Sequence, residues 1–321
     1  MTSPLRMLLL GWTGSHNRTH LGFSMNGFGE VSGPQGRDMA AAHPISPALL
    51  ATQLPDLSNI AFITGGGQKF VYRATHSIHG PVALKIFADF ADPQRAQREV
   101  QAVRSIGCAS VPEIYAVGLL NGGPKPLLWL IEKWLAGDTL RSRLATGPLS
   151  DELIKLVATN VLFVLSEAEG KRIVHRDVKP ENIFISTDGS QCWLLDFGIA
   201  RHLELSTLTA AGSGQGPLSP GYAPPEQIQN YTNKIDCRTD LFALGVTLYE
   251  SLMGVNPFTQ GAADSAEILR RVMHTELPRP TRDIDSRGRF SSLVMVMSRS
   301  RRSLRPRTAA KAYEWARSSI A

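Results

Sequence analysis

The amino-acid sequence predicts an α+β fold made of two parts: a small sheet carrying one helix, and a larger, mostly helical part that follows it. Up to Glu132 the apolar residues gather in short β-branched and aromatic runs separated by Gly and Pro, which is typical of strands. Beyond Gly137 the apolar runs are long and cover nearly every face of a helix, which indicates burial. A chain of 321 residues can hold this arrangement with an ample core.

The N-terminal segment, residues 1–56, is rich in Gly, Ser, Asn, His and Pro and shows little periodicity. Such a composition cannot bury enough apolar surface to offset the entropy of ordering, so we expect a mostly disordered or poorly ordered arm. The apolar stretch from Ala48 to Leu57 is where this arm can begin to order. The short apolar run from Met7 to Leu10 is too short for a secretory leader.

The first folded part, residues 57–132, has a strand-like pattern interrupted by turn residues. Gly65-Gly66-Gly67 and Gly80-Pro81 divide the pattern into separate strands. The elements expected in this part are strands within Asn59–Phe87, a helix over Pro93–Ile106, and strands over Pro112–Leu120 and Pro126–Glu132. Together they predict a small sheet with one helix.

The second folded part, residues 138–321, is predicted to be mostly helical. The run Leu153–Leu165 is apolar nearly all round and predicts a buried helix, and Asp240–Met253 predicts a second, central one. Between them, Ile183–Leu195 has the pattern of a hairpin that turns at Asp188-Gly189.

Charge and cysteine content exclude several classes of function. The net charge of +6 is mild, and the arginine-rich run Arg299–Arg307 is interpreted as a solvated face, so no nucleic-acid partner is expected. The 3 cysteines (Cys108, Cys192 and Cys237) lie far apart without metal-ligand spacing, which fits a reducing, cytoplasmic setting. The longest apolar stretch, Leu241–Met253, is shorter than the roughly 20 residues that a membrane-spanning helix needs, so no span is predicted.

The most informative motif is the run His175-Arg176-Asp177-Val178-Lys179-Pro180-Glu181-Asn182-Ile183, which places an acid, a base and an amide close together. Asp196-Phe197-Gly198 follows it along the chain. In this order and spacing the two motifs match the catalytic loop and the metal-binding loop of protein kinases. Over about residues 58–317 the chain resembles the eukaryotic-type serine/threonine protein kinases, a family with bacterial members. The resemblance implies a two-lobe fold with an antiparallel sheet in the small lobe (57–132) and a mostly helical large lobe (138–321).

Phosphoryl transfer requires immobile phosphates, a metal ion that absorbs charge and an aligned hydroxyl group. The resemblance makes Asp177 the catalytic base that accepts the proton of the substrate hydroxyl. It makes Lys179 a contact of the transferred phosphate. Asn182 and Asp196 carry the oxygen ligands that Mg²⁺ prefers, so ATP and Mg²⁺ are the expected cofactors.

Lys85 lies in the apolar strand run Val82–Phe87, where a lysine is costly unless its charge is paired. The resemblance supplies its partners, which are the α- and β-phosphates of ATP and a glutamate of the next helix. Glu99 is the one glutamate in that predicted helix. The separation between Lys85 and Glu99 is shorter than is usual in the family, so the helix or its lead-in is expected to be shortened.

The glycine-rich stretch departs from the family pattern Gly-x-Gly-x-x-Gly-x-Val. With Val71 as the valine of the pattern, only the middle residue of Gly65-Gly66-Gly67 stands in register. Thr64 replaces the first glycine and Lys69 the third. The flanking glycines supply the freedom that lets backbone amides approach phosphates. Lys69 is either an added charge over the phosphates or an exposed lysine at a strand turn.

The stretch from Leu130 to Asp138 is, by resemblance, the hinge between the lobes. Ile131 would then close the rear of the adenine pocket. Glu132 and Trp134 would present backbone groups to adenine, and Asp138 would accept hydrogen bonds from the ribose hydroxyls.

By resemblance, Arg176 reads a phosphate on the activation segment, residues 198–226, through a charge-assisted pair. The hydroxyl-bearing residues of this segment include Ser206, Thr207, Thr209, Ser213 and Ser219. Thr207 and Thr209 are the preferred autophosphorylation sites.

Three further residues have scaffold roles by resemblance. Glu226, at the end of the segment, is expected to pair with a buried arginine near the C-terminus, Arg305. Asp240 is expected to hold the backbone of the catalytic loop.

Three classes of function remain distinct at this point. The first is a cytoplasmic serine/threonine protein kinase in signalling, which acts on unidentified proteins and autophosphorylates in a transient homodimer. The second is a small-molecule phosphotransferase, against which Lys179 and the segment end Pro224-Pro225-Glu226 stand. The third is a nucleotide-binding pseudokinase scaffold, which only the altered glycine stretch supports.

Overall fold

A computed structural model describes residues 45–66, 69–87, 93–120, 126–197 and 219–320, all within one compact unit of the chain. Most of the predicted arm lies outside the described residues, and so does Gly67. The hydroxyl-bearing residues Ser206, Thr207, Thr209 and Ser213 also lie outside them.

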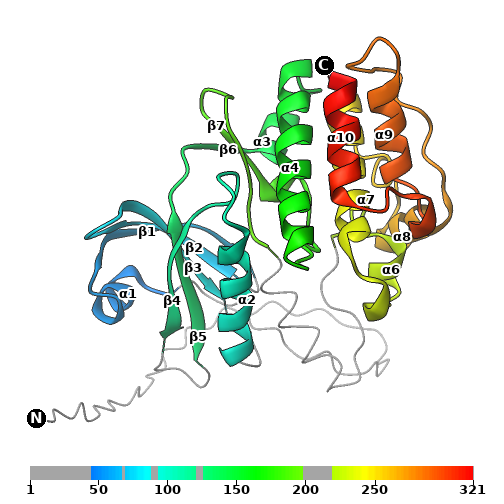
Figure 1. Ribbon diagram of the computed structural model, residues 1–321. Coiled ribbons are helices and arrows are strands. Elements are labelled where there is room, and N and C mark those ends of the chain that lie inside the picture. Colours follow the sequence, from blue (N-terminus) through cyan, green and yellow to red (C-terminus); the bar gives the residue numbers. More distant parts are fainter. Residues whose placement is uncertain (1–44, 67–68, 88–92, 121–125, 198–218, 321) are drawn as a thin grey trace, which may run out of the picture. The chain divides into compact units, whose positions relative to one another are not determined.

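Five strands form the small sheet, and each neighbouring pair is antiparallel (Figure 1), which confirms the predicted fold class. Their order across the sheet is β1-β2-β3-β5-β4. The strands are β1 Leu57–Gly66, β2 Lys69–His76, β3 Gly80–Phe87, β4 Ile114–Leu120 and β5 Leu127–Lys133.

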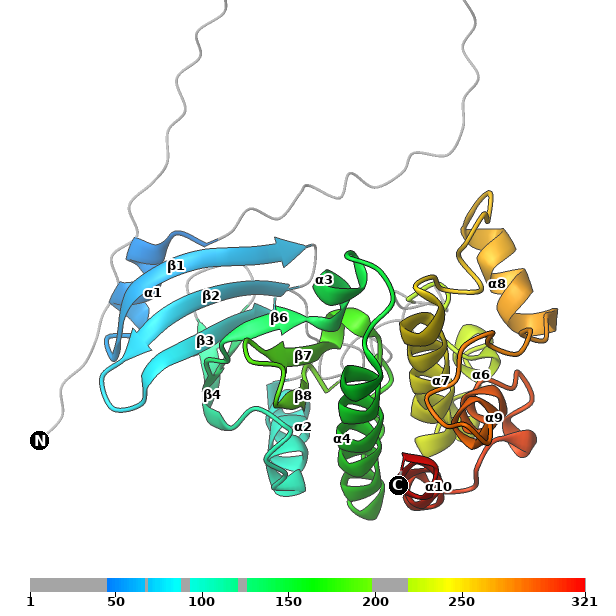
Figure 2. The same cartoon turned by 90° about the horizontal axis from the view of Figure 1, so that it is seen from above.

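The two faces of this sheet pack against different helices, as Figure 2 shows. Leu128 and Leu130 share a buried apolar cluster with helix α2, Pro93–Ile106. Tyr72 and Leu84 belong to a second cluster with helix α1, Pro47–Gln53. Because side chains alternate along a strand, β3, β4 and β5 contribute to both clusters, whereas β1 and β2 contribute to the cluster with α1.

Helix α1 corrects the predicted arm, whose boundary was placed at residue 56. The Ser46 side chain caps the helix by accepting from the Leu49 amide at 3.3 Å, and Pro47 opens the first turn. Leu50 is buried, and the Tyr72 hydroxyl donates to the carbonyl oxygen of Ile45 at 2.9 Å. Residues 45–56 therefore belong to the folded part, whereas disorder of the preceding residues stays a prediction.

A second, three-stranded sheet begins the helical part. Its strands are β6 Gly137–Thr139, β7 Ile183–Ser186 and β8 Cys192–Leu194, in the order β6-β7-β8. Strands β7 and β8 form the predicted hairpin, and its turn contains Gly189 with φ 72°.

Gly137 is a position where we predict that a side chain would not fit. Its φ is 150°, and a Cβ atom there would lie 1.9 Å from the carbonyl oxygen of Ile185. Gly137→Ala is expected to lower the free energy of unfolding by about 1–3 kcal/mol, measured by denaturant titration. Gly147 is the matched control, because its φ is 120° but a Cβ would contact nothing within 4 Å. Equal losses in the two variants would contradict a role for the Ile185 contact.

Helices α4, α9 and α10 pack against α7, which agrees with the central position predicted for that helix. Every residue of α7 from Thr239 to Leu252 is buried. Helix α4 lies beside α10 in both views (Figures 1 and 2). The helices of this part are α3 Leu140–Leu144, α4 Asp151–Gly170, α6 Pro225–Ile228, α7 Cys237–Met253, α8 Ser265–His274, α9 Arg289–Met297 and α10 Ala309–Ile320. Short 3₁₀ turns cover Pro180–Asn182, Thr232–Lys234 and Arg302–Leu304.

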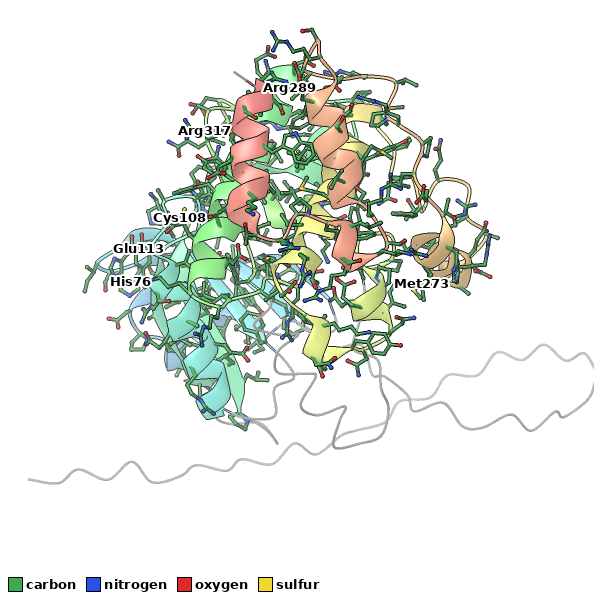
Figure 3. All side chains as sticks on the ribbon, turned by 45° about the vertical axis from the view of Figure 1, so that its right-hand side comes forward. His76, Cys108, Glu113, Met273, Arg289 and Arg317 are labelled. Carbon is green, nitrogen blue, oxygen red and sulfur yellow. The ribbon has the colours of Figure 1, made fainter. Side chains whose placement is uncertain are left out.

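The cysteines and two arginines of the basic run have the following surroundings. All three cysteines are free thiols, with Cys108 (labelled in Figure 3) partly exposed and the other two buried. In the basic run, Arg299 pairs with Glu276 at 2.6 Å, and Arg302 pairs with Asp236. Within the described part of the chain, every helix is too short or too polar to cross a bilayer.

Candidate active site

Of the predicted catalytic residues, Lys85, Asp177 and Lys179 line one cavity of about 620 Å³, a volume typical of small-molecule sites, whereas Glu99 and Arg176 are not part of its lining. Val71 and Lys85 reach the cavity from the small sheet. Asp177, Asn182 and Asp196 reach it from the helical part. Residues that are distant along the sequence therefore share one pocket.

The catalytic loop is held by buried hydrogen bonds, as predicted for Asp240. The amides of His175 and Arg176 each donate to one oxygen of the Asp240 carboxylate at 2.7 Å. Burial raises the pKa of Asp240 to about 7, while these two bonds favour its ionised form. Arg176 adopts φ 67°, a conformation that these contacts stabilise.

His175 links the catalytic loop to the strand that leads into Asp196. Its Nδ1 accepts from the Asp177 amide at 3.2 Å, so Nε2 carries the proton. Nε2 then donates to the carbonyl oxygen of Leu195 at 2.8 Å. The histidine thereby fixes the spacing between Asp177 and Asp196.

Asp177 faces a hydroxyl group in the pocket. The Ser219 Oγ donates to Asp177 Oδ1 at 2.8 Å. Lys179 Nζ lies 2.8 Å from the same hydroxyl and 3.0 Å from Asp177 Oδ2. The arrangement can accept a proton from a hydroxyl while a cation stands beside it. Sequence reasoning named Ser219 only as a segment hydroxyl and missed this contact.

The metal-binding assignment agrees with the orientation of Asn182. Its Nδ2 donates to the backbone oxygen of Asp177 at 2.8 Å and to Asp177 Oδ2 at 3.0 Å. The amide oxygen of Asn182 is then the group available to a cation. With the Asp196 carboxylate this gives two oxygen donors, and Mg²⁺ commonly takes its remaining ligands from phosphates and water. The residues present therefore fit Mg²⁺.

Two lysines contact the carboxylate of Asp196. Lys85 Nζ donates to Oδ1 at 2.8 Å, and Lys69 Nζ donates to Oδ2. Burial raises the pKa of Asp196, but the two lysines lower it and prevail, so the group is ionised. Burial lowers the pKa of Lys85, but Asp196 and Glu132 raise it and prevail, so the ammonium is retained.

The assignment of Ile131 to the rear of the pocket is wrong by one residue. In the sheet, Lys85 lies opposite Leu130, and Ala83 lies opposite Glu132. Glu132 therefore shares the pocket face with Lys85 and pairs with it, whereas Ile131 is buried in the cluster on the other face. A shift of one position moves a strand residue to the opposite face. Burial raises the pKa of Glu132, and Lys85 opposes that rise.

Three further predicted site residues are Trp134 and Asp138, in the expected hinge, and Glu99, on helix α2. Trp134 lines the cavity, and the guanidinium carbon of Arg73 lies 5.0 Å from the centre of its ring. Asp138 is exposed, with Oδ2 3.7 Å from Nη2 of Arg143, and its contact with ribose stays a prediction. Glu99 lies on α2, and its pairing with Lys85 also stays a prediction.

The glycine-rich hairpin lies at the cavity, and its predicted contact with phosphates stays a prediction. Lys69 and Val71 line the cavity, and Gly66 pairs with Lys69 at the end of the hairpin. A Cβ atom on Gly65 would lie 2.6 Å from Cδ1 of Phe70. Gly65 thus permits close packing within the hairpin.

The predicted scaffold pair of Glu226 and Arg305 is present. Arg305 is completely buried at its side chain and donates to both oxygens of Glu226, at 2.6 and 3.1 Å. A second network was missed, in which Arg141 contacts Glu181 at 2.7 Å and Glu250 at 2.6 Å. These charges tie α3 and α7 to the catalytic loop.

A family model and the similar proteins of known sequence all point to protein kinases. The family model described as protein kinase domain matches residues 59–314. The serine/threonine-protein kinase PknL of Mycobacterium bovis is 34% identical over 249 residues, covering 75% of this chain and 59% of PknL. The serine/threonine-protein kinase pkn3 of Myxococcus xanthus is 31% identical over 236 residues, covering 69% of this chain and 42% of pkn3. The serine/threonine-protein kinase PknB of Mycobacterium leprae is 34% identical over 216 residues, covering 64% of this chain and 34% of PknB. The chain thus spans at most 59% of the length of these relatives.

Proposed function

Since the chain belongs to the protein kinase family, we propose that it is an ATP- and Mg²⁺-dependent serine/threonine protein kinase. The observation that carries the proposal is the position of Asp177, whose carboxylate accepts a serine hydroxyl at 2.8 Å beside Lys179. A substrate hydroxyl in the same place would have a proton acceptor and a cation at its reacting oxygen.

In the proposed reaction the substrate hydroxyl oxygen attacks the γ-phosphorus of ATP. The bond from the γ-phosphorus to the bridging oxygen breaks, ADP leaves with that electron pair, and the hydroxyl proton passes to Asp177. Lys179 stabilises the negative charge on the transferred group. Asn182 and Asp196 would hold Mg²⁺, which when bound neutralises charge on the phosphates. Lys85 orients the α- and β-phosphates.

Lys69 supplies a further charge over the phosphates in this proposal, because its ammonium already reaches Asp196 inside the pocket. Lys69→Ala is expected to raise the KM for ATP roughly two- to tenfold, which is the worth of one partly exposed charge contact. Steady-state kinetics at saturating acceptor would measure it. Lys171→Ala, at an exposed position after α4, serves as the control. An unchanged KM in Lys69→Ala would show that this lysine is only a surface residue.

Protein hydroxyls are favoured over small molecules as the acceptor because Ser219, itself a residue of a peptide chain, reaches the proposed catalytic base Asp177. The test is incubation of the protein with ATP and Mg²⁺, followed by mass spectrometric mapping of phosphorylated residues. Phosphate on Ser or Thr, Thr207 and Thr209 above all, is the expected result. Transfer to a small alcohol without transfer to protein would favour the alternative phosphotransferase.

The same proposal includes how the kinase activity would be regulated and in which compartment the chain would work. A phosphate on the activation segment would be read by Arg176, and its addition would require a transient homodimer. The chain would work where ATP and a reducing environment coexist, which is the cytoplasm, because its thiols are free.

A further inference from the structure

Glu132 has a buried carboxylate side chain that takes no part in the proposed reaction. It is 8% exposed, lines the cavity and pairs with Lys85. Lys85 lies opposite Leu130 in the sheet, and Glu132 stands two residues further along β5 on the same face. Diagonal neighbours of this kind are within reach of long side chains. The pair is therefore built into adjacent strands and does not depend on the position of a helix.

The lysines occupy the carboxylate that is proposed to bind metal. Lys85 contacts Oδ1 of Asp196 at 2.8 Å, and Lys69 contacts Oδ2. Together with Glu132 these residues form a cluster of two positive and two negative charges. A metal ion that binds Asp196 needs at least one of its oxygens, and each oxygen already accepts from a lysine, so Mg²⁺ and the two lysines compete for the same carboxylate. If the buried ammonium of Lys85 leaves the Asp196 carboxylate, it needs another anion as a partner, because an unpaired buried charge is costly.

We propose that Glu132 is a positioning residue that retains Lys85 when Asp196 takes up Mg²⁺. With Glu132 present, Lys85 can loosen its hold on Asp196 and still keep a carboxylate partner in the sheet. One of its ammonium protons then remains for a phosphate oxygen. Without Glu132, Lys85 would compete with Mg²⁺ for the Asp196 carboxylate. This inference rests on the proposed function, which makes Asp196 a metal ligand.

The test is the Mg²⁺ dependence of ATP binding in Glu132→Gln, which keeps the shape of the side chain and removes its charge. Calorimetric titration with ATP at a series of free Mg²⁺ concentrations measures the Mg²⁺ needed for half of the gain in affinity. That concentration is expected to rise about tenfold, the effect of one charge-assisted contact. Affinity for ATP without Mg²⁺ is expected to stay the same or increase, because the variant pocket gains net positive charge.

A purely structural role for Glu132 would have a different signature. Glu226→Gln is the matched control, since it also uncharges a buried partner of a cation but lies outside the cavity. It is expected to lower Tm without changing the Mg²⁺ requirement. The same pattern in Glu132→Gln, a lower Tm with the wild-type Mg²⁺ requirement, would overturn the proposal.

A second variant keeps the test decisive if Glu132→Gln does not fold. Lys69→Met/Glu132→Gln restores the balance of charge in the cluster and is expected to fold. Because loss of Lys69 also frees Oδ2 of Asp196, the double variant is compared with Lys69→Met, and its Mg²⁺ requirement is expected to be the higher of the two. Equal requirements in Lys69→Met and the double variant would contradict the role of Glu132. Failure of the proposed function is distinguishable, because a wild-type chain that binds MgATP without transferring phosphate still gives the binding curves. ATP binding that does not respond to Mg²⁺ in the wild type would refute the inference.

Discussion

Asp177→Asn is expected to lower kcat by roughly 10²–10⁴-fold, the usual contribution of a positioned general base. The amide has nearly the shape of the carboxylate but cannot take the hydroxyl proton. The contacts of Asp177 with Asn182 and Ser219 are local, so the affinity for ATP is expected to change little. Steady-state phosphorylation of an acceptor protein, with ATP affinity measured separately, would check both expectations.

The matched control is Asp56→Asn, a substitution of the same type at an exposed position before β1. It is expected to keep the wild-type kcat. A wild-type rate in Asp177→Asn would show that another group accepts the proton. A large loss of ATP affinity in that variant would instead indicate that the substitution disturbs the pocket.

Arg305→Met is expected to reduce the free energy of unfolding by about 3–5 kcal/mol, as is usual when one partner of a buried ion pair is removed. The substitution would leave the buried carboxylate of Glu226 with the Thr239 hydroxyl, at 3.1 Å, as its remaining described side-chain partner. Urea or guanidinium titration followed by circular dichroism would measure the loss.

Arg282→Met tests whether burial is the cause of that loss. Arg282 pairs with Asp151, but the two side chains are 33% and 43% exposed. Exposed pairs contribute about 0–1 kcal/mol, so a small effect is expected. Removal of both charges in Arg305→Met/Glu226→Met is expected to restore part of the lost stability. Equal losses for the buried and the exposed arginine would contradict the dominant role of burial.

The sequence predicted the fold class and came close to the ends of α2, β4 and β5, because prolines and apolar periodicity mark them. It also predicted the residues that meet in the pocket, since their order along the chain is characteristic. It indicated that the arm can begin to order from Ala48 onward, but it did not predict helix α1, because Pro47–Gln53 is only 7 residues long. The burial of Leu50 against the sheet is a tertiary contact that a local pattern does not contain.

The error at the rear of the pocket has a different physical cause. Both Ile131 and Glu132 fit a strand, and an apolar residue is the ordinary choice for a buried wall. The register between β5 and β3 determines which of these two side chains points into the pocket. That register is set by contacts between residues that are distant in sequence. The network around Arg141 was missed for the same reason, because Arg141, Glu181 and Glu250 lie on three separate segments.

The most direct test of phosphoryl transfer by this pocket is incubation of the purified protein with Mg²⁺ and γ-labelled ATP, beside Asp177→Asn and a sample without Mg²⁺. Label on protein Ser or Thr residues in the wild type, lost without Mg²⁺ and strongly reduced in Asp177→Asn, is the predicted result. Bound ATP without any labelled protein, or equal labelling of wild type and Asp177→Asn, would contradict it.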